Sequence, residues 1–243
     1  MTFLPLLRFS GVDRCVRGLL LFATAFISLF VSSLLFAHGV EEGDAMFIEQ
    51  ASGAQLLPFI YLGAKHMVTG YDHLLFLAGV IFFLYRMKDV GIYVTLFAVG
   101  HSVTLLYGVL SEINVNAYMV DAIIGFSVVY KAMDNLGAFR RWFGFQPNTK
   151  AAVLIFGFFH GFGLATKLQD FTLSDNGLVA NILAFNVGVE IGQLMALSII
   201  LIAMNFWRRS DVFPRQALAA NVLLMSAGFM LMGYQLTGLY TVS

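Results

Sequence analysis

The sequence has 243 residues, of which 59% are hydrophobic and only 12% are charged. The mean hydropathy of +0.83 corresponds to more apolar surface than a soluble domain of this length can bury. Lysine plus arginine and aspartate plus glutamate number 14 each, so the net charge gives no reason to expect a nucleic-acid partner. The composition therefore excludes an ordinary soluble domain and predicts an integral membrane protein in contact with a lipid bilayer.

The single cysteine, Cys15, limits the chemistry that the chain can carry. One cysteine excludes a disulfide framework and a thiolate metal site. It also excludes the C-x-x-C-H pattern that attaches a c-type haem. Any metal site must therefore use nitrogen and oxygen ligands.

The N-terminal segment has the pattern of an export signal. Three arginines precede an apolar run from residue 18 to residue 37, after which the chain becomes polar at His38. We expect residues 1–37 to be a signal peptide; an uncleaved anchor helix is the alternative, because the run is long and Leu35 is large for its place. Cleavage after residue 37 would give His38 a free amine, which could chelate a metal ion together with the imidazole.

Residues 38–243 are predicted to form one all-α domain, a polytopic bundle of transmembrane helices. Six mature spans are expected, at residues 72–86, 91–110, 117–133, 151–168, 178–206 and 216–238. The apolar stretch 55–66 is too short to cross a hydrocarbon layer of ~30 Å, so we expect a short re-entrant or interfacial helix on the outer side. Gly157 and Gly161, four residues apart, predict a close contact between two helices.

The predicted loops alternate in charge along the chain. The first, third and fifth loops are basic, with Arg86 and Lys88, then Lys131, Arg140, Arg141 and Lys150, then Arg208, Arg209 and Arg215. The second and fourth loops contain Glu112, and Asp170 and Asp175. The positive-inside rule therefore places the basic loops in the cytoplasm, and both ends of the mature chain on the outer, periplasmic side of a bacterial inner membrane.

Histidines and carboxylates lie within or beside these apolar segments. A charge near the bilayer centre costs at least ~2.5 kcal/mol on insertion scales, so such residues are candidates for function. His66, Asp72 and His73 stand at the outer entrance to the first span. A continuous helix would place His66 and His73 on one face, whereas a turn at Gly70, which we expect, would bring His66 back toward Asp72 and His73. Two imidazoles and a carboxylate form a ligand set suited to a transition metal.

Further candidates lie deeper in the spans. In the fifth span, Asn186, Glu190 and Gln193 follow an i, i+4, i+7 spacing and share a helix face. The predicted metal ligands are His66, Asp72, His73, His101, Asp121, His160 and Glu190, and the predicted secondary polar lining is Thr104, Asn186 and Gln193. For the lone histidines, asparagine and glutamine, a hydrogen bond between helices is the alternative; for Asp121 it is an interfacial position.

These motifs resemble the HupE/UreJ family of membrane proteins. The most specific element is Gly70-Tyr-Asp72-His73 with His66 before it, similar to the family's His-Pro-x-x-Gly-x-Asp-His signature. The motifs around His101, His160 and Asn186 resemble the second, less characterised branch of the family. Two positions depart from the pattern: Met67 replaces the proline, and Asp121 stands where a glutamate is expected.

The resemblance implies a role in handling metal, nickel in particular, for His66, Asp72 and His73. Our leading hypothesis is a permease, and not an enzyme, that passes a divalent transition metal by facilitated diffusion through weak binding at several sites. The ligand types suit nickel and also cobalt, copper, zinc or iron, and only the resemblance favours nickel. Two alternatives stay open: an accessory protein for the assembly of a metalloenzyme partner, and a haem or metal redox subunit with His101 and His160 as axial ligands.

Overall fold

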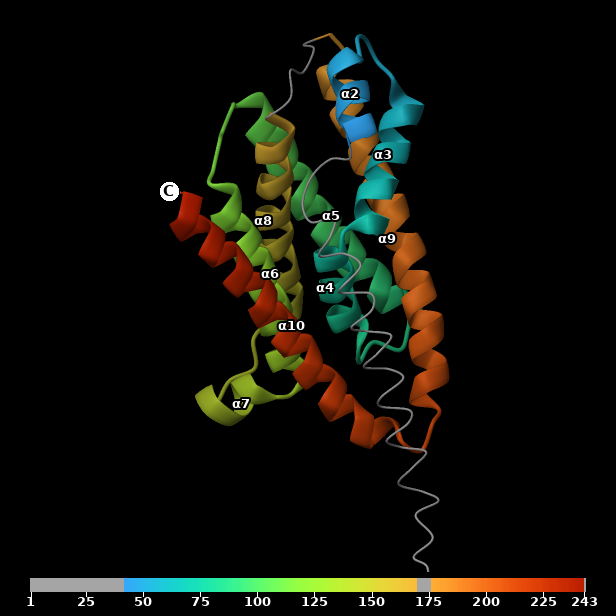
Figure 1. Cartoon of the computed structure of the whole chain (residues 1–243). Coiled ribbons are helices and arrows are strands. Elements are labelled where there is room, and N and C mark those ends of the chain that lie inside the picture. Colours follow the sequence, from blue (N-terminus) through green and yellow to red (C-terminus); the bar gives the residue numbers. More distant parts are fainter. Residues whose placement is uncertain (1–41, 170–175, 243) are drawn as a thin grey trace, which may run out of the picture.

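The computed structural model describes residues 42–169 and 176–242, and these residues form helices without any strand. The all-α prediction is confirmed (Figure 1). The proposed signal peptide, residues 1–37, and His38 lie outside the described residues. The helices are α2 (Glu42–Gln50), α3 (Leu56–Thr69), α4 (Tyr71–Ile81), α5 (Met87–Leu110), α6 (Ala117–Asn135), α7 (Ala138–Phe143), α8 (Thr149–Gln169), α9 (Leu178–Arg208) and α10 (Phe213–Val242).

Four of these helices are long and apolar enough to cross a membrane: α5, α8, α9 and α10. They agree with four of the predicted spans. The predicted span at 117–133 corresponds to α6, which has 19 residues but contains three charged ones, Asp121, Lys131 and Asp134. The helix at the predicted span 72–86 is shorter than expected, because α4 ends at Ile81. The count of six spans therefore stays a prediction.

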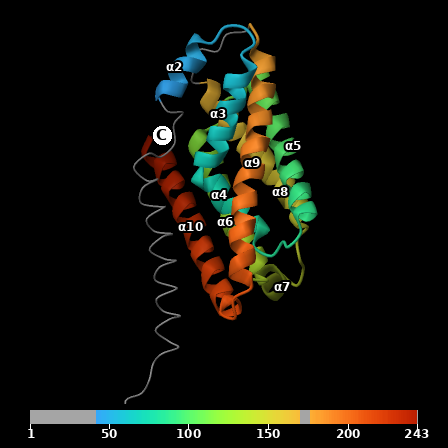
Figure 2. The same cartoon turned by 90° about the vertical axis from the view of Figure 1, so that its right-hand side faces the viewer.

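Helices α3 and α4 follow one another through the bundle with a break at Gly70 (Figures 1 and 2). Gly70 has an extended backbone, with φ −72° and ψ 99°, while its N–H still bonds to the carbonyl of His66. At 1.5 Å per residue, α3 is about 21 Å long and α4 about 16 Å long, so neither crosses ~30 Å of hydrocarbon alone. The stretch 55–66, expected to be a short re-entrant or interfacial helix, lies almost entirely within α3, which leads through Gly70 into α4. Met67 lies inside α3 and has the backbone N–H that a helix continuing to Thr69 needs, which a proline at this position would lack.

The connections between helices gather at two ends of the bundle. The links from α4 to α5, from α6 through α7 to α8, and from α9 to α10 all lie at one end (Figures 1 and 2). The arginines of the predicted basic loops lie in these links or in the helix turns beside them, so we call this end the basic end. Glu112 of the second loop follows α5 at the opposite end, and Asp170 and Asp175 of the fourth loop lie outside the described residues.

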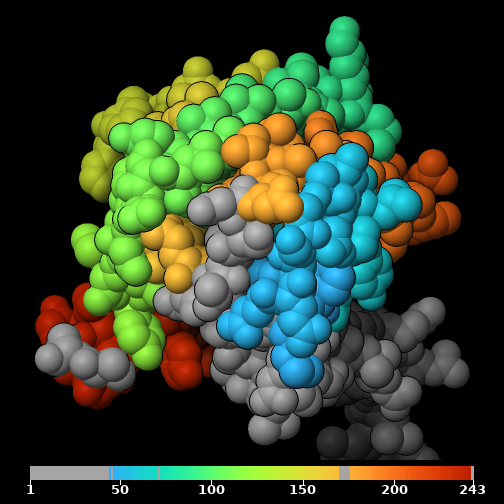
Figure 3. All heavy atoms as spheres, turned by 90° about the horizontal axis from the view of Figure 1, so that it is seen from above, coloured from blue at the N-terminus to red at the C-terminus, as the bar shows by residue number. Residues whose placement is uncertain are grey.

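At the opposite end, Asn181 of α9 binds the segment between α2 and α3. Its side-chain oxygen accepts a hydrogen bond from the backbone N–H of Gln55 at 2.7 Å, and its amide nitrogen donates to the carbonyl of Gly53 at 2.9 Å. Figure 3 looks onto this end and shows the first turns of α9 beside the N-terminal helices. These bonds fix the start of α3 against α9.

Helices α5 and α8 approach closely at glycines, as predicted for Gly157 and Gly161. A Cβ atom on Gly157 would lie 2.6 Å from the carbonyl oxygen of Phe97, and one on Gly161 would collide with the carbonyl oxygen of His101. Only residues without a side chain allow this contact. The close approach brings the middle of α5, with His101, next to the middle of α8, with His160.

Arg208, the last residue of α9, binds the end of α4. Its guanidinium donates to the carbonyls of Ile81, Phe82 and Leu84 at 2.5, 2.6 and 2.8 Å. The last carbonyls of a helix have no partner within the helix and carry partial negative charge, so a cation is favourable there. Arg208 thus holds the basic end of the short helix whose other end carries Asp72 and His73.

Candidate functional site

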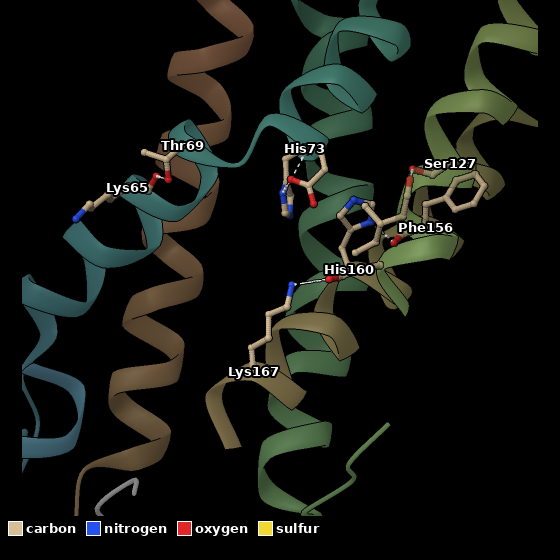
Figure 4. Close-up of polar contacts among 10 residues, drawn as sticks. Lys65, Thr69, His73, Ser127, Phe156, His160 and Lys167 are labelled. Carbon is tan, nitrogen blue, oxygen red and sulfur yellow. Dashed lines mark hydrogen bonds and ion pairs between the residues drawn. The ribbon is translucent and has the colours of Figure 1, made fainter. Parts of the chain in front are cut away.

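Four histidines from four helices meet in the middle of the bundle. His66 is in the last turn of α3, His73 in the first turn of α4, His101 in α5 and His160 in α8. The ring centroids of His66 and His73 are 5.2 Å apart, and those of His73 and His160 are 4.8 Å apart. The ring of Phe97 joins His101 to this group, with centroid distances of 6.1 Å to His101 and 4.9 Å to His160. We call these four residues the histidine cluster; His160 and His73 are visible in Figure 4.

Three of the four imidazoles place Nδ1 against an oxygen atom. The pairs are His73 with the Oδ1 of Asp72 at 2.9 Å, His160 with the carbonyl of Phe156 at 2.7 Å, and His101 with the Oδ1 of Asn186 at 3.3 Å. These oxygens can only accept, so Nδ1 must carry the proton and donate it. In the neutral ring the other nitrogen, Nε2, is then left with a free lone pair.

The Nε2 atoms of all four histidines are buried and have no hydrogen-bond partner among the described residues. His73, His101 and His160 are 5%, 0% and 2% exposed. An unsatisfied buried polar atom costs about 1–3 kcal/mol, and a group of four requires an explanation. Histidines that bind metals have this arrangement, with one nitrogen donating to a carboxylate or carbonyl oxygen and the other directed at the ion.

The cluster is not a finished coordination sphere. Among the described residues, no three histidine, cysteine, aspartate or glutamate side chains are placed so that they could hold a metal ion as they stand. Side-chain rotation would have to bring Nε2 atoms together around an ion. A site whose side chains must rearrange before they can bind an ion is suited to transient binding more than to permanent metal storage.

Gly70 and Asp72 determine how His73 is presented. The Oδ1 of Asp72 accepts hydrogen bonds at 2.9 Å from both the backbone N–H and the Nδ1–H of His73. Asp72 lies in the first turn of α4, where the helix dipole favours a negative charge. A Cβ on Gly70 would lie 2.8 Å from His73 Nδ1 and 3.2 Å from Asp72 Oδ1. Glycine is therefore needed at the break so that the ring and the carboxylate can meet.

Asp121, a predicted ligand, has both oxygens occupied by a lysine that the sequence analysis missed. The ammonium of Lys167 donates to Oδ1 at 3.1 Å and to Oδ2 at 3.0 Å. Lys167 follows His160 by seven residues on α8, so the two share a helix face. That spacing was the available signal in the sequence.

The predicted polar stripe on α9 is only partly directed into the bundle. Asn186 is buried against His101, and Gln193 is fully buried with neither amide atom bonded among the described residues. Glu190 is exposed on the surface of α9 and is not brought to the histidine cluster. Thr104 connects α5 to α8 by donating to the carbonyl of Phe158 at 2.7 Å. Its hydroxyl therefore contributes to helix packing.

Three phenylalanines lie beside the cluster on the side of the basic end. Phe76 follows His73 by three residues, while Phe97 and Phe156 precede His101 and His160 by four. Helix α4 runs toward the basic end, whereas α5 and α8 run away from it. Each phenylalanine therefore lies nearer to the basic end than the histidine on the same helix. The ring of Phe76 is 5.8 Å from each of the other two, and the three residues are at most 7% exposed. They form an apolar layer, which we call the phenylalanine layer, between the histidines and the basic end.

The fold and this site define a helical membrane protein with an interrupted helix and a buried histidine cluster. A sequence model of the HupE / UreJ protein family matches residues 42–243. The chain belongs to this family, as its motifs predicted. Comparisons with curated proteins and with solved structures found no match.

Proposed function

We propose that this protein is a permease that passes a divalent transition metal, nickel in the first place, across a bacterial inner membrane. The observation that carries the proposal is the set of three histidines whose Nδ1–H groups are fixed by oxygens while their buried Nε2 atoms have no partner among the described residues. The family is associated with nickel or cobalt transport or with accessory functions, which supports a metal as the ligand.

The interrupted helix supports transport across a membrane. In transporters, discontinuous helices place binding groups near the middle of the bilayer, where half-helix ends replace water around an ion. Here the break at Gly70 brings His66 from one half-helix and Asp72 and His73 from the other to the centre of the bundle. We therefore expect one central binding site at the histidine cluster, instead of an outer site followed by deeper ones.

The direction of the chain follows from the positive-inside rule. We place the basic end in the cytoplasm, which puts the start of α3 and the C-terminus on the periplasmic side. A metal ion entering from the periplasm would reach the histidine cluster before the phenylalanine layer. The ion would pass that layer only when the rings of Phe76, Phe97 and Phe156 rotate aside, since an apolar constriction closes a path to hydrated ions.

The cargo is a borderline metal because the site offers imidazole nitrogens and carboxylate oxygens. Cobalt, copper, zinc and iron share these preferences with nickel, so family membership alone favours nickel. An accessory role in metalloenzyme assembly, with binding and no flux, is the second candidate, and the buried phenylalanine layer is the observation that favours it. The packing of the Phe97 ring against both His101 and His160 disfavours a haem between them.

Nickel uptake into liposomes containing the purified full chain tests the permease directly. We expect uptake by the wild type and a loss of at least about tenfold in His73→Ala, which removes a central ligand. Ser127→Ala is the matched control, because Ser127 is fully buried but donates only to its own helix, at Ile124. Tight stoichiometric binding without uptake would favour the accessory role, and uptake unchanged by His73→Ala would refute the site.

A further inference from the structure

The ion pair between Lys167 and Asp121 is unusual in its position within an otherwise apolar region. The side chain of Asp121 is 7% exposed and that of Lys167 is 28% exposed. Among the described residues, Asp121 accepts hydrogen bonds from Lys167 and from no other donor. The ammonium is thus the one positive partner that these residues provide for the buried carboxylate.

Lys167 is directed toward the histidine cluster. Figure 4 shows its side chain extending along α8 in the direction of His160. Its partner Asp121 lies beside the same stretch of α8, because a Cβ atom on Gly163, three residues after His160, would be 3.8 Å from Asp121 Oδ1. Lys167 lies on the other side of the histidines from the phenylalanine layer, because α8 runs away from the basic end and Lys167 follows His160. An ion approaching from the end opposite the basic end would therefore meet this pair next to the cluster.

A second buried lysine–aspartate pair provides a contrast. Lys131 donates to Asp134 at 2.5 Å within α6, near the basic end, and Asp134 also accepts from Gln146 and from Thr149. With three donors its carboxylate is part of a local network that ties α6 to the start of α8. Asp121 has no such network among the described residues, so its oxygens would become available as soon as Lys167 moved.

We propose that Lys167 is a built-in counter-cation that occupies Asp121 in the metal-free protein, and that a divalent metal ion replaces it during entry. This inference rests on the proposed function and adds a residue that regulates binding at the same site. A flexible lysine can leave the carboxylate without disturbing the helices, and its own charge opposes the binding of the metal. Lys167 therefore weakens metal binding, which keeps the ion from being trapped.

Nickel binding to the full chain in lipid nanodiscs, measured by calorimetry at constant pH and salt, tests the inference. We expect Lys167→Gln to bind nickel about tenfold more tightly than the wild type, and Lys167→Arg to bind like the wild type. Lys131→Gln is the matched control, since it breaks the other buried pair and should not tighten nickel binding.

Two further measurements separate this role from a merely structural ion pair. Lys167→Gln leaves a buried carboxylate unpaired, so its Tm should fall, and nickel should raise that Tm more than it raises the Tm of the wild type. X-ray absorption at the nickel edge should detect an added oxygen ligand in Lys167→Gln that is missing in Lys167→Gln/Asp121→Asn.

The outcomes distinguish this inference from the proposed function. Nickel binding in the wild type that is lost in His73→Ala, with no tightening in Lys167→Gln, would overturn the role of Lys167 alone. Tightening without the added oxygen ligand would also overturn it, because the effect would then be one of charge at a distance. No nickel binding by the wild type or by any variant would overturn the proposed function together with this inference.

Discussion

Gly70→Ala provides a sharp test of how the break in the α3–α4 path positions the site. The backbone at residue 70, with φ −72° and ψ 99°, is accessible to alanine. Replacing glycine at such a position normally stabilises a protein by about 0.4–1 kcal/mol, because the unfolded chain loses freedom. The backbone alone therefore predicts a variant at least as stable as the wild type.

The side chains around residue 70 predict that Gly70→Ala weakens metal binding. The new methyl group would lie 2.8 Å from His73 Nδ1, closer than real Cβ atoms come to neighbouring atoms, so the ring must move. Movement breaks the 2.9 Å bond to Asp72, a hydrogen bond to a charged group worth about 1.5–3 kcal/mol. Loss of the partner that orients a ligating histidine typically lowers metal affinity about 10–100-fold. We expect a net loss of stability of about 1–2 kcal/mol, the difference between these two effects.

The assay is nickel calorimetry with a parallel thermal melt, on Gly70→Ala and on Gly91→Ala. Gly91 lies in α5, and a Cβ atom added to it would have no neighbouring atom within 4 Å, so alanine there should leave nickel binding unchanged. Wild-type nickel affinity in Gly70→Ala would refute the reasoning, since it would mean that the contact between His73 and Asp72 does not prepare the ligand. If Gly91→Ala lost as much nickel affinity, the effect would be due to a change in helix flexibility and not to the contact with His73.

Three further predictions follow from the same contacts. Asn186→Leu removes the acceptor of the His101 Nδ1–H, so nickel affinity should fall about tenfold in calorimetry. Arg208→Ala leaves three carbonyls at the end of α4 without their donor, so a thermal melt should show a loss of about 1–3 kcal/mol with nickel affinity largely retained. Lowering the pH should weaken nickel binding, because protons compete with the metal for Nε2; binding that strengthens toward acid would contradict imidazole ligation.

The sequence determined the elements that depend on local composition. The stretches near α5, α8, α9 and α10 were predictable because about twenty consecutive apolar residues need no tertiary context to identify a span. The small residues Gly157 and Gly161 indicated a close helix contact for the same reason. The histidines were recognisable as candidates because polar groups are costly in apolar segments.

The tertiary structure alone decided which of these residues meet. Helix rotation and crossing set the direction of each side chain, and neither can be read from one helix at a time. For this reason Glu190 shares a helix face with Asn186 by its spacing yet is exposed, and Asp121 proved to be paired with Lys167, 46 residues away. The histidines were predicted in an order along the membrane but converge in one cluster. The break at Gly70 places the end of α3 and the start of α4 beside the glycine contacts of α5 and α8.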